Sequence, residues 1–119
     1  MNIYKTDVTQ EYYTQERCHI IEILNLPQEY PNLSIARARV EVGIETQLHS
    51  LHQIDETYYV LEGTGLLTVG NEQKRVGRGD CILIQKGVAQ KILNDGSNDL
   101  IFLCICLPGF RPESYQVEE

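Results

Sequence analysis

The stretch LHSLHQIDETYYVLEG, residues 48–63, places two histidines, a pair of adjacent acidic residues and two tyrosines before a glycine. Side chains alternate between the two faces of a β-strand, so we expect His49 and Leu51 to share a face. His52 should point the other way unless a bulge re-aims it. A hairpin would bring His49 close to Glu56, and imidazole with carboxylate suits a divalent first-row metal. The alternative is a strand whose polar residues lie on its solvent face.

Length and charge limit the classes of protein. The chain has 119 residues, the size of one domain, and 42% of them are hydrophobic, which is typical of a globular protein. The net charge of −7 disfavours nucleic acid as a partner, because phosphates repel an acidic surface and the basic residues form no patch. No apolar run approaches the roughly 18 residues of a membrane-spanning helix, and the N-terminus lacks the features of a signal peptide. We therefore expect no nucleic-acid partner and no membrane partner.

The four cysteines, Cys18, Cys81, Cys104 and Cys106, include no C-x-x-C pair. Cys104 and Cys106 would lie on the same face of one strand, which is poor geometry for a disulfide. Reduced thiols are typical of the cytoplasm, so we expect a cytoplasmic protein.

Short runs rich in β-branched and aromatic residues, separated by turn sequences, cover most of the chain. Many short strands at regular spacing are typical of a β-sandwich or barrel. The two ends of the chain are less regular, and we expect Tyr12, Tyr13 and Tyr115 to cover a barrel end or a partner chain. The expected strands are 19–24, 33–41, 47–52, 56–62, 65–69, 73–76, 81–84, 90–93 and 100–107.

The glycines and polar residues of the opening stretch resemble the first motif of the cupin superfamily. Five residues separate Gly43 from His49, and six separate Glu56 from Gly63. The motif normally continues from its first histidine as H-x-H, and that second histidine falls on Leu51 here.

A second stretch resembles the second cupin motif, which reads glycine, five residues, proline-x-glycine, two residues, histidine, three residues and asparagine. Gly79, Gly87 and Asn94 stand at the required intervals. Gln85 occupies the place of the proline, and Gln90 occupies the place of the ligand histidine.

The resemblance covers residues 39–107 and implies an all-β fold, a double-stranded β-helix (jelly-roll) cupin barrel with a ligand pocket at its centre. We expect one cupin domain over residues 1–119, with its core barrel at about 33–107. The resemblance also implies a homodimer, and the N-terminal segment 1–24 is the candidate for the dimer contact.

Carried over residue by residue, the resemblance implies that His49, Glu56 and Gln90 hold a divalent ion, either zinc, nickel, manganese or iron. His52 would join them if its strand bulges. The amide oxygen of Gln90 is a weaker donor than imidazole, so the site is expected to be weakened or altered. Plainer roles stay open: hydrogen-bonded pocket residues for His49 and Gln90, and surface positions for Glu56 and His52.

Tyr58 is the candidate catalytic residue, because an inward hydroxyl would orient a substrate and handle protons; a core position is its commoner role. In the run SIARARV either the alanines or the arginines could face the pocket. We favour Ala36 and Ala38 as the pocket wall, with Arg37 and Arg39 pairing with partner carboxylates; the reverse would let the arginines bind an acidic ligand.

We therefore expect a small metal-binding cupin that takes a small-molecule ligand. As an enzyme it would be a Lewis-acid metalloenzyme of the cyclase, isomerase or dioxygenase type. The segments YYVLEGTG and IFLCICLPGFRPESY are also similar to a single-domain cupin subfamily that includes a metal-dependent polyketide cyclase. The alternative is a non-catalytic binding or sensing barrel with a degenerate metal site, which the residues at positions 51, 85 and 90 favour.

Overall fold

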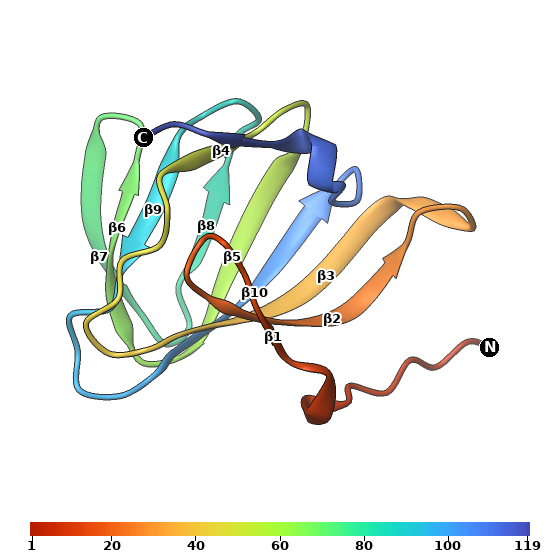
Figure 1. Ribbon diagram of the computed structural model, residues 1–119, viewed down its shortest axis with the longest axis horizontal. Helices are drawn as coiled ribbons and strands as arrows, with labels where there is room; N and C mark the ends of the chain where they lie inside the picture. The colour runs from red at the N-terminus through yellow and green to blue at the C-terminus, as the bar shows by residue number, and fades with distance from the viewer.

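Two antiparallel β-sheets face each other and close into a barrel in the computed structural model, which describes residues 1–119 (Figure 1). The strands are β1 (Tyr12–Tyr13), β2 (His19–Leu26), β3 (Tyr30–Val40), β4 (His49–Leu51), β5 (Asp55–Glu62), β6 (Thr64–Val69), β7 (Glu72–Gly77), β8 (Cys81–Ile84), β9 (Gln90–Leu93), β10 (Leu100–Leu107) and β11 (Tyr115–Val117). One sheet has the order β1-β2-β3-β10-β5-β8, and the other has the order β11-β4-β9-β6-β7. The chain passes repeatedly between the sheets, as the predicted double-stranded β-helix requires.

The all-β class and the predicted strands are confirmed. Three predicted strands, β8, β9 and β10, have the bounds that the structure shows, and the others differ by at most three residues at an end. β3 begins earlier than expected because Tyr30 pairs with Leu26 at the tip of the β2–β3 hairpin. The sequence pattern does not predict β1 and β11, since two or three residues are too few to show alternation.

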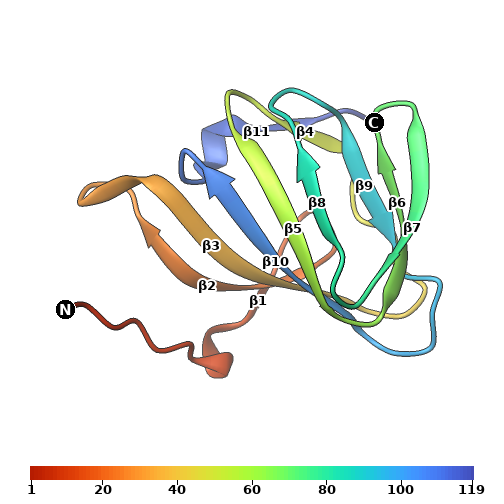
Figure 2. The ribbon, with the colours of Figure 1, turned by 180° about the vertical axis from the view of Figure 1, so that it is seen from behind.

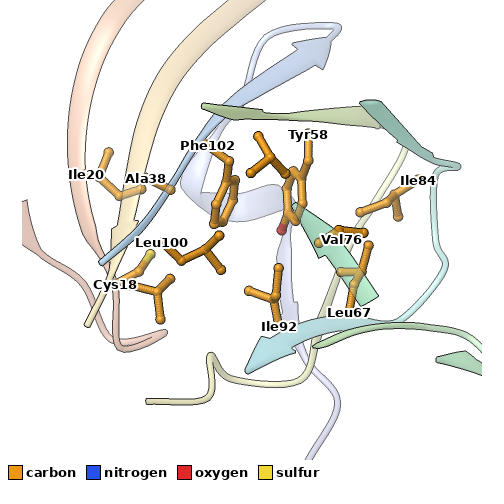
Figure 3. Packing of buried hydrophobic residues seen from close by; sticks show 12 residues of the cluster. Cys18, Ile20, Ala38, Tyr58, Leu67, Val76, Ile84, Ile92, Leu100 and Phe102 are labelled. Carbon is orange, nitrogen blue, oxygen red and sulfur yellow. The ribbon is translucent and has the colours of Figure 1, made fainter. Parts of the chain in front are cut away.

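Inward side chains from both sheets form the main apolar core (Figure 3). Burial of each large aliphatic side chain contributes about 1.5–3 kcal/mol to folding. The rings of Tyr58 and Phe102 pack at 4.5 Å between centroids, which joins β5 to β10 in the middle of this core. The core residues are Cys18, Ile20, Ala38, Val40, Tyr58, Val60, Leu67, Val76, Ile84, Ile92, Leu100 and Phe102.

The alternation predicted for β3 is confirmed. Ala36 and Ala38 face the interior, where their small side chains leave room between the sheets. Arg39 points outward and forms ion pairs with Glu11 at 2.6 Å and with Asp99 at 3.2 Å. Its expected carboxylate partners therefore belong to the same chain.

Gly63 closes the turn between β5 and β6. Its φ is +82°, and an added Cβ would lie 2.6 Å from the carbonyl oxygen of Asp99. Both the backbone conformation and the close approach require glycine here. The turn carries the chain from β5 into β6, which belong to different sheets.

The N-terminal segment extends the chain's own sheet. β1 pairs with β2, and β2 pairs with β3. Residues before η1 (Val8–Gln10) leave the barrel as an extended tail (Figure 2). The homodimer contact expected for residues 1–24 stays a prediction.

Two further features complete the fold. All four cysteines are free thiols, as predicted. The helical segments, η1 and η2 (Pro112–Ser114), have three residues each, and neither is long or apolar enough to cross a membrane.

Candidate functional site

A cavity of about 190 Å³ lies inside the barrel, beneath β4, β11 and the loop between β1 and β2. Most of its lining is apolar, and polar side chains from β4, β5 and the loop converge in it. An apolar cavity of roughly 150 Å³ already admits benzene. The space therefore suits one small ring with a few substituents.

His49, at the start of β4, is the most informative of the lining residues. Its side chain is only 4% exposed. Nδ1 lies 2.7 Å from the carbonyl oxygen of Gln47, which can only accept, so Nδ1 carries the proton of the neutral ring. Nε2 then holds the free electron pair and lies 3.6 Å from a carboxylate oxygen of Glu16, beyond hydrogen-bond distance. The ring of Tyr115 stacks on the imidazole at 4.6 Å and 15°.

A chain of buried hydrogen bonds lies beside this histidine. Gln90 is the cross-strand partner of His49, so both side chains project from the same face of their sheet. The amide Nε2 of Gln90 donates to Oε1 of Glu56 at 2.9 Å, and its Oε1 accepts from the hydroxyl of Tyr58. The thiol of Cys106 lies 3.6 Å from the other oxygen of Glu56. Each polar atom of the Glu56–Gln90–Tyr58 chain thus has a partner.

The protonation of this chain follows from its burial. Burial, and after it the nearby Glu16 carboxylate, raise the pKa of Glu56 to about 7, although the hydrogen bonds from Gln90 and the thiols oppose the shift. Burial also raises the pKa of Tyr58 well above its ordinary value, so its hydroxyl remains a donor. Near neutral pH, Glu56 is therefore a mixture of acid and carboxylate.

Glu16 is a site residue that the sequence patterns do not reveal. It lies in the loop between β1 and β2, where a turn is closed by hydrogen bonds from Arg17 N to Thr14 O and from Thr14 N to Cys18 O. The carbonyl of Glu16 accepts from the amide of Gln47 at 3.0 Å, which holds the loop over the barrel mouth. No motif or periodicity marks this position, because only the folded loop brings it to His49.

The structure brings together four of the five site residues that the sequence suggested. His49, Glu56, Gln90 and Tyr58 are all buried in the barrel interior. The fifth, His52, is exposed in the turn after β4, because the strand has no bulge there and Leu51 takes the inward position. His52 therefore does not face the cavity.

Comparison with known proteins identifies the family to which this barrel belongs. The profile of the family described as "Cupin domain" matches residues 36–106, which is more than half of the chain. This chain belongs to the cupin family. The predicted resemblance is thereby confirmed for the fold.

Three similar proteins illustrate the family. An uncharacterized protein of Methanocaldococcus jannaschii is 38% identical over 123 residues, which cover 100% of this chain and 98% of that one. Pac13, a nucleoside dehydratase from Streptomyces, superimposes with a TM-score of 0.80 at 19% identity, covering 99% of this cupin and 92% of its own chain. KdgF from Halomonas superimposes with a TM-score of 0.79 at 14% identity, covering 94% and 98%. These two structural likenesses show the shared fold.

The residues of this cupin do not fit the metal centre that the resemblance implied. Both polar atoms of Gln90 are engaged within the Glu56–Gln90–Tyr58 chain, and its NH₂ group points at the carboxylate that would hold the ion. An apolar side chain, Leu51, stands where the motif has a second histidine. No group of three histidine, cysteine, aspartate or glutamate side chains is arranged to hold a metal. The donor set therefore favours hydrogen bonding over ligation.

Proposed function

We propose that this cupin is a metal-independent enzyme of the lyase or isomerase type that moves protons on a small cyclic molecule. The observation that carries the proposal is the state of His49. Its Nδ1 is held by a backbone carbonyl, and its Nε2 makes no hydrogen bond while the residue lines the cavity. An imidazole whose Nδ1 donates to a carbonyl can use its Nε2 as a general base.

Glu56 supplies the matching acid. It lines the same cavity, and a pKa of about 7 leaves a large share of it protonated at neutral pH. A proton acceptor and a proton donor that line the same cavity form an acid–base pair. In this proposal Gln90 and Tyr58 hold the Glu56 carboxyl in place and do not contact the reacting atoms.

A dehydration illustrates the roles. His49 Nε2 takes a proton from a carbon of the ligand, and the electron pair of that C–H bond forms the new double bond. The neighbouring C–O bond breaks as Glu56 gives its proton to the hydroxyl, which leaves as water. The Glu16 carboxylate, 3.6 Å from Nε2, stabilises the imidazolium that forms. An isomerisation would return the proton to another atom of the ligand.

A structural neighbour supports this reaction class. Pac13 is a nucleoside dehydratase with the same fold, and its structures include complexes with uridine. A barrel of this architecture can therefore host the dehydration of a nucleoside.

A second candidate is a non-catalytic ligand-binding barrel. The polar atoms of Glu56, Gln90 and Tyr58 are hydrogen-bonded to one another, which favours this candidate. Buried polar groups with a purely structural role are hydrogen-bonded in the same way. The two candidates differ in whether a bound ligand turns over.

The decisive experiment measures turnover without metal. Protein purified without a histidine tag is treated with EDTA, checked by elemental analysis, and incubated in D₂O with nucleosides, monosaccharides, amino sugars and cyclic ketones. Proton NMR follows loss of water and exchange of C–H protons. We expect turnover that survives EDTA and falls about 10²- to 10⁴-fold in His49→Gln. His52→Gln, the same exchange at an exposed histidine, is the matched control.

Other outcomes separate the alternatives. Turnover that EDTA abolishes and one divalent ion restores would establish a Lewis-acid metalloenzyme instead. Saturable binding by a ligand that is never converted, in the wild type and in His49→Gln alike, would establish the binding barrel.

A further inference from the structure

The charged side chains around the cavity are all acidic. Glu16 and Glu22 lie toward its rim and Glu56 in its interior, and no lysine or arginine lines it. Arg17 and Arg111 each stand next to a lining residue in the sequence. Their guanidinium groups do not line the cavity and donate hydrogen bonds to backbone carbonyls instead. An anionic ligand would therefore meet carboxylates without a counter-charge, at a cost that grows as water is excluded.

A second and independent observation concerns His49. Its side chain is more than nine-tenths buried, and Nε2 points into the cavity without a hydrogen-bond partner. Glu16 lies 3.6 Å from that nitrogen. A cation held by the Glu16 carboxylate would place the atoms bonded to it beside Nε2.

Aromatic rings form a third element of the lining. Five aromatic side chains face the cavity, including both phenylalanines of the chain. Aromatic faces attract cations, and protein sites for ammonium groups are often built in this way. The five are Tyr12, Tyr58, Phe102, Phe110 and Tyr115.

We infer that the ligand of this cavity is a small ring that carries a protonated amine, with Glu16 as the residue that binds the amine. The inference rests on the proposed function for the place of the ligand, and it adds the chemical class. Glu16 anchors the ammonium group, the aromatic walls enclose the ring, and Nε2 of His49 faces the adjoining ring atoms. Carboxylate and phosphate ligands are rejected.

The test compares three probes of one shape: cyclohexylamine, cyclohexanol and cyclohexanecarboxylate. Each is titrated into ¹⁵N-labelled protein at about pH 7.5, where the amine is a cation and the acid an anion. We expect the amine to bind at least about tenfold more tightly than the alcohol, with shifts at the amides of Glu16 and His49, and the carboxylate to produce none. Added salt should weaken binding of the amine and leave binding of the alcohol unchanged.

Variants assign the preference to one residue. Glu16→Gln should reduce the preference for amine over alcohol to less than about threefold, while Glu72→Gln, the same exchange at an exposed glutamate, keeps it. Glu16 is 21% exposed, so its replacement should leave the fold intact, and circular dichroism verifies this. The salt dependence of the wild type gives a reading that needs no variant.

Two results overturn the inference: alcohol that binds as tightly as amine, and carboxylate that binds best. The titration requires no turnover, so its outcome does not depend on whether the proposed catalysis occurs. A barrel that prefers the amine and converts nothing refutes the catalysis alone. A barrel that dehydrates a neutral sugar and ignores amines refutes the amine inference alone.

Discussion

The Glu56–Gln90–Tyr58 chain and the His49–Glu16 pair are neighbours in the barrel and differ in how fully their polar atoms are hydrogen-bonded. In the chain, both oxygens of Glu56, both ends of Gln90 and the hydroxyl of Tyr58 have partners. In the pair, Nε2 of His49 lacks a hydrogen bond, and the Glu16 side chain is 21% exposed. The chain therefore fixes the position of the Glu56 carboxyl, whereas Nε2 of His49 and the Glu16 carboxylate remain available to a ligand.

Replacement of Gln90 should give the largest loss of stability. Gln90→Leu keeps the approximate volume and leaves Oε1 of Glu56 and the hydroxyl of Tyr58 buried without partners. We expect the free energy of unfolding to fall by about 2–5 kcal/mol, measured by urea denaturation. His49→Leu should cost only about 1–2 kcal/mol, because one hydrogen bond is lost. Equal losses would show that both groups are structural.

The pH dependence of stability should identify Glu56. Its pKa of about 7 in the folded state exceeds its ordinary value of 4.5, so the folded state keeps a proton that the unfolded state releases. The stabilisation is complete below pH 4.5 and is lost as the pH rises toward 7. We expect a decrease in the free energy of unfolding of about 3 kcal/mol across this window.

The control for this titration is Glu56→Gln, which cannot ionise. The difference in unfolding free energy between wild type and variant, measured by urea denaturation at several pH values, should change across the same window. A constant difference would mean that Glu56 is not buried as an acid, and the proposed general acid would fail with it.

Tyr58→Phe tests whether the tyrosine belongs to the chain or to the chemistry. Loss of the hydroxyl leaves Oε1 of Gln90 without its donor, which should cost about 1–2 kcal/mol of unfolding free energy. With a substrate identified, kcat should fall less than about tenfold, against about 10²- to 10⁴-fold for His49→Gln. A fall in kcat as large as that of His49→Gln would show that Tyr58 is a catalytic residue, as the sequence suggests.

Tyr115→Phe should have the smallest effect. The variant keeps the ring that stacks on His49 and loses only the hydrogen bond from the hydroxyl to Gln47 at 2.8 Å. Because this bond is partly exposed, we expect a loss of about 0.5–1 kcal/mol in thermal or urea unfolding, and an unchanged affinity for cyclohexylamine. A larger loss of affinity would show that the hydroxyl itself orients the His49 ring.

Much of the barrel is predictable because strand patterns are local. Alternation along β3 places Ala36 and Ala38 inside, and the runs that form β8, β9 and β10 have the predicted bounds. The motif intervals place His49, Glu56 and Gln90 in one interior, since a strand's register decides which face a residue joins. The short strands β1 and β11 are not predictable in this way. Two or three residues are too few to show alternation, and β11 pairs with β4, which is far from it in the chain.

The sequence by itself determined the fold class, the family and the residues that enter the barrel, because periodicity and fixed spacing encode register. Only the tertiary structure decided what those residues do to one another. It engaged Gln90 with Glu56 and Tyr58, and turned His52 outward. It also brought Glu16 and Tyr115, from the two ends of the chain, to His49. The physical reason is that hydrogen bonds and burial depend on which side chains are in contact in the folded chain. Contacts between residues that are distant in the sequence produce no local pattern from which they could be predicted.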